Sequence, residues 1–149
     1  MVIFVHLTSE RNVDTIVRQG ITRMRGQDDH PAGIFAMPAA RSFHVSHQWL
    51  HELKDRGHLR AAAIYFRLPE SEAVWAGHYR DCHERVAAKQ AMEWFLREKR
   101  PQGFEVIIPR RISPNEIYRI HHLARVLPLK PIMYATQSTR LETANHRLE

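Results

Sequence analysis

The chain has 149 residues, of which 44% are hydrophobic and 26% are charged, a composition typical of one globular domain. Its single cysteine, Cys82, excludes an intramolecular disulfide, and no apolar run approaches the ~20 residues that a membrane span needs. Lys and Arg outnumber Asp and Glu by 22 to 16, so the net charge of +6 favours polyanionic partners.

The first predicted elements alternate between strands and helices along the chain. Val2 to Val5 is a short apolar run typical of a strand, and Ser9 to Gly20 carries apolar residues at helical spacing, with a glycine placed to end the helix. The polar segment Thr22 to Ala32 predicts a loop before a short strand at Ile34 to Met37. A helix is expected over Ser42 to Arg56, where large apolar residues recur every four positions.

The second half of the chain carries the strongest strand patterns. Ala61 to Leu68 and Ala73 to Gly77 predict two strands joined by a turn, and Asp81 to Lys99 predicts a long helix. Phe104 to Ile108 is the clearest strand pattern. Further β-structure is expected at Ile112 to Ile120 and Leu127 to Tyr134. Together these elements predict one α+β domain over residues 1–134, followed by a polar, loose tail over 135–149.

Three short motifs occur in a recognisable order. One strand ends in His6-Leu7-Thr8, a second contains Gly33-Ile34-Phe35-Ala36 and is followed by Ser42, and a third begins Phe104-Glu105-Val106. Together they resemble the histidine-tyrosine-glutamate branch of the NAD-dependent ADP-ribosyltransferase superfamily, which includes the poly-ADP-ribose polymerases. DNA-modifying ADP-ribosyltransferase toxins and RNA 2'-phosphotransferases look similar in their openings. The resemblance implies an ADP-ribosyltransferase-like fold, with a split, mostly antiparallel β-core flanked by helices, and NAD as the substrate.

The chemistry of NAD cleavage gives an independent reason for an acidic residue. Breaking the bond between nicotinamide and ribose creates an oxocarbenium-like centre, which a nearby carboxylate stabilises. Glu105 is the candidate catalytic residue, because it opens an apolar strand where a charged side chain is otherwise a poor choice. His6 ends another apolar strand, where an imidazole nitrogen could donate to a ribose hydroxyl, and Thr8 offers a second hydroxyl.

The resemblance also implies contacts between NAD and further residues. His6 would hold the adenosine ribose, the Leu7 backbone would take the nicotinamide amide, and Phe35 would stack on the nicotinamide ring without the hydroxyl of the family's tyrosine. The other implied NAD-binding residues are Thr8, Gly33, Ser42 and His44. Arginine-modifying members carry an acidic residue or glutamine where this chain has Gly103, so an arginine acceptor is not expected. The acceptor stays open between nucleic acid and protein.

Several of these residues also have a purely structural interpretation. His6 could be a histidine at the edge of the core that bonds a backbone carbonyl. Glu105 could be a strand-end carboxylate that pairs with Arg110 or Arg111. Ser42 could serve only as the cap of the helix that it begins.

Two groups of histidines offer competing sites. One group would share a helix face and could bind zinc, but it lacks a fourth ligand, so a solvated face is favoured and no metal is expected. Its members are His44, His47 and His51. The second group is expected to lie in a loop and at the start of a helix rather than in a site: His78, Cys82 and His83.

The expected function is therefore NAD-dependent ADP-ribosyl transfer, with Glu105 stabilising the transition state. One alternative is an RNA 2'-phosphotransferase-like enzyme, and another is a basic nucleic-acid-binding module without catalysis on the same fold. The start of the chain has no signal-peptide pattern, so we expect a cytoplasmic protein without a membrane partner. The enzymatic hypothesis requires His6, Phe35 and Glu105 to converge on one cleft.

Overall fold

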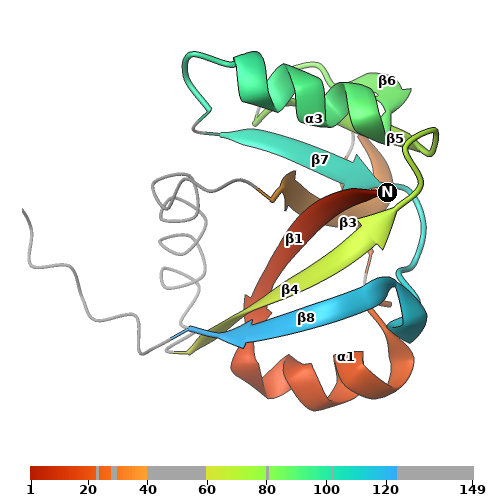
Figure 1. The fold of residues 1–149 in the computed structure, drawn as a ribbon, viewed down its shortest axis with the longest axis vertical. Coiled ribbons are helices and arrows are strands. Elements are labelled where there is room, and N and C mark those ends of the chain that lie inside the picture. Colours follow the sequence, from red (N-terminus) through yellow and green to blue (C-terminus); the bar gives the residue numbers. More distant parts are fainter. Residues whose placement is uncertain (23, 28–29, 40–59, 80, 102, 124–149) are drawn as a thin grey trace, which may run out of the picture.

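Antiparallel β-structure dominates the part of the chain that the structure describes. The structure is a computed structural model, and it describes residues 1–22, 24–27, 30–39, 60–79, 81–101 and 103–123. Its strands form a single twisted sheet with helices packed at opposite ends (Figure 1). The predicted α+β class is confirmed. Within the described residues, no helix has the length and apolar character needed to cross a membrane.

The described elements follow one another in the order in which their labels appear in Figure 1. The strands are β1 (Val2–Ser9), β2 (Arg25–Gln27), β3 (His30–Pro38), β4 (Ala61–Leu68), β5 (Ala73–His78), β6 (Glu84–Ala87), β7 (Phe104–Ile108) and β8 (Ile117–His122). The helices are α1 (Val13–Gln19) and α3 (Ala88–Arg97), with single 3-10 turns η1 (Glu10–Asn12) and η2 (Pro114–Glu116). The sheet order is β6-β5-β7-β3-β1-β4-β8, and β2 pairs with β3 outside this path.

The sheet consists of two halves with a narrow join. Strand β1 pairs with β4 along its whole length, from Val2 opposite Leu68 to Ser9 opposite Ala61. With β3 it shares two residue pairs, Phe4 with Pro38 and Val5 with Met37. We call β1, β4 and β8 the first half and β3, β7, β5 and β6 the second half. Because pairing between the halves stops after Val5, the sheet opens from His6 onward.

Alternation along the strands explains where the core lies. In β4, Ile64 and Phe66 have no exposed surface, whereas Arg67 is exposed and Tyr65 is partly exposed. Phe66 stacks on Phe4 of β1 with ring centroids 6.1 Å apart. This two-residue period is the pattern of a strand with one face on the core and one toward water.

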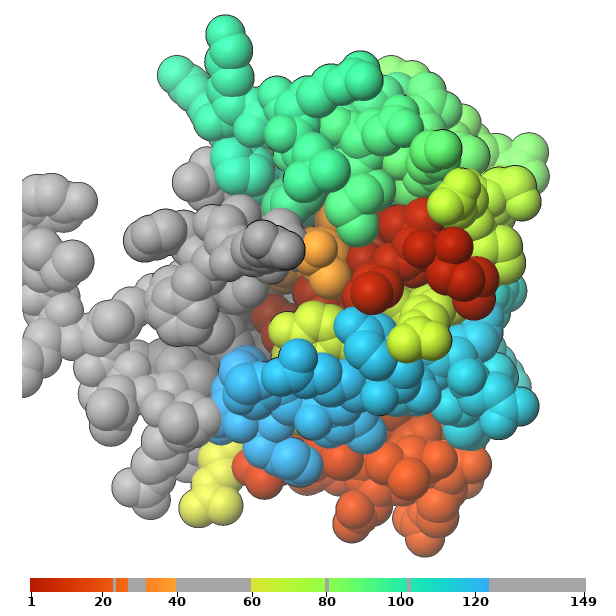
Figure 2. Space-filling model, viewed as in Figure 1, coloured from red at the N-terminus to blue at the C-terminus, as the bar shows by residue number. Residues whose placement is uncertain are grey.

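Each helix covers a different half of the sheet. Phe95 of α3 packs on Phe104 of β7 with ring centroids 5.5 Å apart. At the other end, Val13 and Ile16 are the buried residues of α1, and the space-filling view shows α1 and β8 side by side there (Figure 2). Gly20 ends α1 with a φ of 79°, and a Cβ there would lie 2.0 Å from the Ile112 carbonyl oxygen, which requires glycine.

Two predictions are wrong in their details. The predicted helix over Asp81 to Lys99 begins only at Ala88, because Glu84–Ala87 forms β6 and pairs with β5. The predicted loop Thr22 to Ala32 contains β2 and the start of β3, which pair with each other. In both segments hydrogen bonding to a neighbouring strand outweighs the local pattern.

The other predicted strands are confirmed or extended. Strands β4 and β7 have the predicted bounds, while β1 and β3 are longer than predicted. The segment Ile112 to Ile120 is only partly strand, since Ile112 forms an isolated bridge with Ile21 before η2 and β8. The predicted helix Ser42 to Arg56, the predicted strand Leu127 to Tyr134 and the tail lie outside the described residues.

Candidate functional site

The three sequence motifs lie on three neighbouring strands. His6, Phe35 and Glu105 belong to β1, β3 and β7, which are consecutive in the sheet. Phe35 pairs with Ile107, so Phe35 and Glu105 share one face of the second half. Val5 pairs with Met37 on that same face, so His6, the next residue, leaves β1 on the other face. A ligand touching both His6 and Glu105 must pass the end of the β1–β3 pairing.

The Glu105 carboxylate is buried and paired with a histidine that the sequence prediction did not assign to the site. Glu105 is 3% exposed, and its Oε1 lies 3.0 Å from Nε2 of His83, whose side chain has no exposed surface. The other ring nitrogen of His83, Nδ1, lies 3.0 Å from the carbonyl oxygen of Asp81. A carbonyl oxygen only accepts, so Nδ1 carries a hydrogen. Nε2 and the carboxylate are in contact at the distance of an ion pair, without the geometry of a hydrogen bond.

Gly77 makes this pair possible. It lies opposite Glu105 on the intervening strand β5, and the pairing of Ala76 with Glu84 brings His83 alongside it from the other side. A Cβ on residue 77 would lie 3.4 Å from Cγ of His83 and 3.1 Å from the Cys82 carbonyl oxygen. Without a side chain at this position, the imidazole reaches across β5 to the carboxylate on β7. His83 thus precedes a strand and does not begin a helix, which corrects the sequence prediction.

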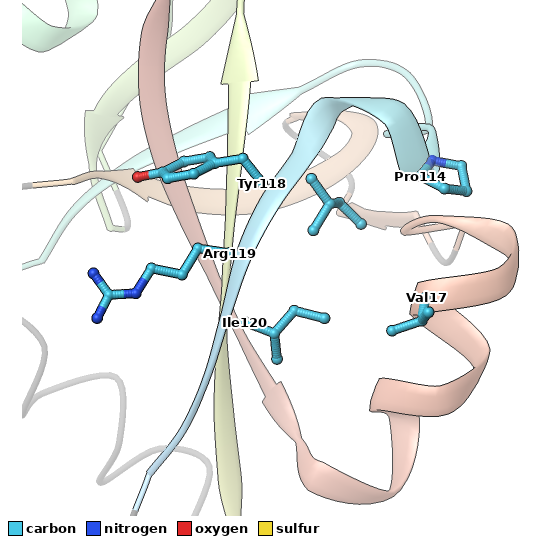
Figure 3. A pocket seen from close by; sticks show the side chains of 6 residues that line it. Val17, Pro114, Tyr118, Arg119 and Ile120 are labelled. Atoms are coloured by element: carbon cyan, nitrogen blue, oxygen red, sulfur yellow. The ribbon is translucent and has the colours of Figure 1, made fainter.

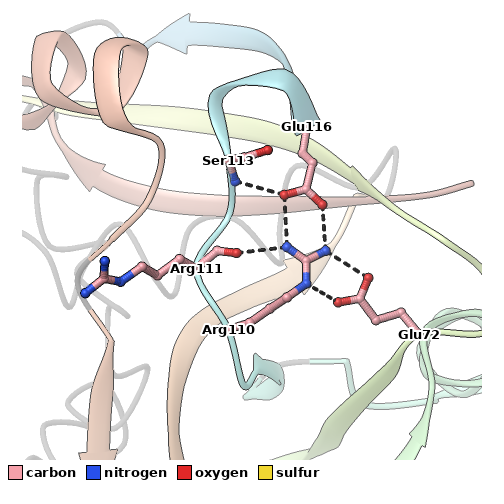
Figure 4. A network of polar contacts seen from close by, with 5 residues as sticks. All are labelled: Glu72, Arg110, Arg111, Ser113 and Glu116. Atoms are coloured by element: carbon pink, nitrogen blue, oxygen red, sulfur yellow. Dashed lines mark hydrogen bonds and ion pairs between the residues drawn. The ribbon is translucent and has the colours of Figure 1, made fainter.

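The alternative pairing of Glu105 with Arg110 or Arg111 is wrong. Arg110 instead binds Glu72 and Glu116 through both of their carboxylate oxygens, as Figure 4 shows. Its Nη1 also donates to the carbonyl of Arg111 at 2.8 Å. The two carboxylates raise the pKa of Arg110, Glu116 more than Glu72, and Arg110 holds the pKa of Glu116 below its ordinary value. We call Arg110, Glu72 and Glu116 the arginine cluster.

His6 makes the backbone contact of the structural alternative. Its Nδ1 lies 2.7 Å from the Phe35 carbonyl oxygen, at the point where the halves of the sheet open. Burial lowers the pKa of His6, outweighing the Phe35 bond that raises it, so the ring is neutral near pH 7. Nδ1 therefore donates to the carbonyl, and Nε2 is an acceptor. A ribose hydroxyl would donate to Nε2, the reverse of the direction expected from the sequence.

The remaining described candidates have clear structural partners. Thr8 is buried, and its hydroxyl accepts a hydrogen bond from Asn12 at 2.9 Å, which ties β1 to η1. Leu7, which lies between His6 and Thr8 in sequence, is partly buried. A Cβ on Gly33 would lie 2.5 Å from Cγ2 of Ile107, so the close approach of β3 to β7 itself requires glycine.

Several predicted positions lie outside the described residues. These are Ser42, His44, His47 and His51. Among the residues that the structure does describe, no three histidine, cysteine or acidic side chains are grouped closely enough to hold a metal.

A separate surface depression lies away from the three motif strands. It has a volume of about 320 Å³ and is lined by residues of α1, η2 and β8: Val17, Pro114, Ile117, Tyr118, Arg119 and Ile120. Val17 and Ile120 face each other across it, whereas Tyr118 and Arg119 project from the opposite side of β8 (Figure 3). None of the predicted site residues lines this depression.

Comparisons with known proteins do not place the chain in a family. No family model, no curated protein and no solved structure matches it.

Proposed function

We propose that the chain binds NAD and transfers ADP-ribose to an acceptor, with Glu105 as the catalytic carboxylate. The observation that supports this proposal is the order β7-β3-β1, which makes neighbours of the three strands that carry the motifs, with Phe35 and Glu105 on one face and His6 on the other. Paired strands lie about 4.8 Å apart, so the backbones of β1 and β7 are about 10 Å apart where β1 still pairs with β3, a distance that a nucleoside spans.

Glu105 would act through its negative charge. The positive charge of an oxocarbenium-like centre develops only as the nicotinamide bond breaks, so an ionised carboxylate stabilises the transition state more than bound NAD. Phe35 shares a face with Glu105 and is partly buried. Its ring would stack on nicotinamide beside the reacting carbon.

The neutral His6 ring would accept a hydrogen bond from a hydroxyl of the adenosine ribose. Its position beyond the last β1–β3 pair puts it where the two halves of the sheet open. Because Glu105 is 3% exposed, NAD must displace neighbouring side chains to reach the carboxylate. Binding is therefore expected to change amide hydrogen exchange in β3 and β7.

The first test is thermal unfolding with NAD. A ligand at about 100 times its dissociation constant stabilises the folded state by roughly 2.7 kcal/mol, which raises the unfolding temperature by several degrees. An unchanged unfolding temperature up to millimolar NAD would contradict the proposal.

The second test separates binding from chemistry. Glu105→Gln keeps the shape of the side chain and removes its charge, so NAD binding should survive while release of nicotinamide falls on the order of 100-fold. Glu84→Gln is the matched control, because Glu84 is exposed on β6, which β5 separates from β7. A variant at residue 105 that keeps the wild-type rate would remove Glu105 from the mechanism.

The same assay can identify the acceptor class. The protein and radiolabelled NAD would be incubated in separate reactions with one acceptor class each. The acceptors are a protein mixture, single-stranded DNA, and RNA with or without a 2'-phosphate. Label transferred to one class identifies the acceptor. Loss of a 2'-phosphate from RNA, with label in the released product, would favour the RNA 2'-phosphotransferase-like alternative.

A further inference from the structure

We propose that His83 is a positioning residue for Glu105: its imidazolium, anchored by the Asp81 carbonyl, keeps the buried carboxylate ionised and oriented for reaction. The consequence for catalysis rests on the proposed function. The protonation state of His83 and Glu105 does not depend on that function, and it can be measured without any enzymatic activity.

The first step of the argument is the cost of a buried carboxylate. A carboxylate removed from water favours its neutral form unless a partner compensates the charge. Glu105 is 3% exposed, so bulk water cannot supply that compensation. The Nε2 atom of His83 lies 3.0 Å from Oε1, close enough for a positive charge on the ring to compensate the carboxylate.

The second step is the anchor on the other side of the ring. Nδ1 donates to the carbonyl of Asp81 at 3.0 Å, and a carbonyl oxygen that accepts this bond stabilises the imidazolium further. The pair then contains a protonated imidazole and an ionised carboxylate. A proton moved from Nε2 to Oε1 would cancel both charges and leave Glu105 unable to stabilise an oxocarbenium-like centre.

The third step is the space made for the ring. Gly77 lies between the two side chains on β5, and a Cβ there would lie 3.1 Å from the Cys82 carbonyl oxygen and 3.3 Å from the His83 Cα, so the backbone that carries the imidazole would have to shift. A side chain on this middle strand would stand between β6 and β7 on the face that His83 and Glu105 share. The absence of a side chain at Gly77 therefore serves the contact between the two ionisable groups.

The direct test is the nitrogen NMR spectrum of the full chain at pH 7.5, with ¹⁵N-labelled histidine. His83 is expected to show two protonated nitrogens and to become neutral in Glu105→Gln, which cannot hold a negative charge. His6 serves as the internal reference, because its ring is expected to be neutral with Nδ1 protonated. A neutral His83 in the wild-type protein would overturn the proposal.

The kinetic test uses His83→Gln, whose amide keeps a polar group beside Oε1 but carries no charge. The kcat for nicotinamide release is expected to fall about 10-fold with KM for NAD unchanged within about two-fold, because the lost charge acts mainly in the transition state. His78→Gln is the control, since His78 instead contacts the Arg100 carbonyl at 3.1 Å. An unchanged kcat in His83→Gln would overturn the positioning role.

Two further controls keep the test decisive. The double variant His83→Gln with Glu105→Gln contains two neutral amides, so it should remain folded if a lone charge in either single variant causes unfolding. If the wild-type protein releases no nicotinamide, the proposed function fails, while the NMR spectrum still decides whether His83 keeps Glu105 ionised.

Discussion

The His83–Glu105 pair and the arginine cluster are both ionic, but they differ greatly in their exposure to solvent. The two side chains of the pair are 0% and 4% exposed, whereas the Arg110 side chain is 39% exposed. In the pair, which lies on the second half of the sheet, Nε2 of His83 is 3.0 Å from Oε1 of Glu105. Arg110 instead contacts two carboxylates, from the β4–β5 turn and from η2.

The two ionic groups differ in what can compensate the remaining charge when one partner is removed. In the arginine cluster, water and the second carboxylate can compensate when one partner is removed, so each contact contributes little on its own. In the buried pair, bulk water cannot reach the remaining charge, because the two side chains are 0% and 4% exposed. The buried pair is therefore the more sensitive element.

The largest expected effect comes from removing one member of the buried pair. His83→Ala leaves the Glu105 carboxylate without its histidine and should lower the free energy of unfolding by about 3–5 kcal/mol, measured by urea denaturation. His122→Ala is the control, because the 57% exposed His122 side chain pairs with Glu10 at the surface. Equal effects of the two substitutions would abolish the contrast between buried and exposed pairs.

A smaller effect is expected from crowding the pair without removing a charge. Gly77→Ala places a methyl group against the His83 ring and the Cys82 carbonyl, and the resulting shift should cost roughly 1–3 kcal/mol. Denaturation measures the loss, and the His83 nitrogen spectrum should change at the same time. A variant as stable as the wild type, with an unaltered spectrum, would show that the contact between His83 and Glu105 does not require glycine at position 77.

The arginine cluster should respond less to the loss of its central residue. Arg110→Gln is expected to lower the free energy of unfolding by about 1 kcal/mol, since solvent already screens this half-exposed group. The loss should shrink in 1 M salt. Arg111→Gln is the matched control, because the cluster uses only the backbone carbonyl of Arg111. A loss as large as that of His83→Ala would reverse the comparison.

The smallest expected effect is a decrease in the free energy of unfolding at acid pH. Arg110 lowers the pKa of Glu116 below its ordinary value of 4.5, so the folded protein binds fewer protons than the unfolded chain in this range. The contribution is present above pH 4.5 and is lost as the pH falls through the lower folded-state pKa of Glu116. Denaturation curves should show this loss in the wild type and a weaker one in Arg110→Gln. Identical pH profiles would contradict the role assigned to Arg110.

Local patterns determined the elements that have strong internal signals. Strand β4 is an apolar run with β-branched and aromatic members, and β7 is a short apolar run after a break, so both could be predicted with their observed bounds. Gly20 ends a helix because a residue with positive φ is needed there, which is again a local requirement. The order of the motifs also allowed His6, Phe35 and Glu105 to be selected together.

Only the tertiary structure decided which side chains meet. Residues Glu84–Ala87 form a strand instead of the first turns of a helix because β5 offers a hydrogen-bonding partner, which no local pattern records. That strand brings His83 beside Gly77, and the register of β5 with β7 then brings Glu105 to the same place. His83 and Glu105 are 22 positions apart, and their contact depends on two strand registers at once. A shift of either register by one residue would turn one of the two side chains to the opposite face.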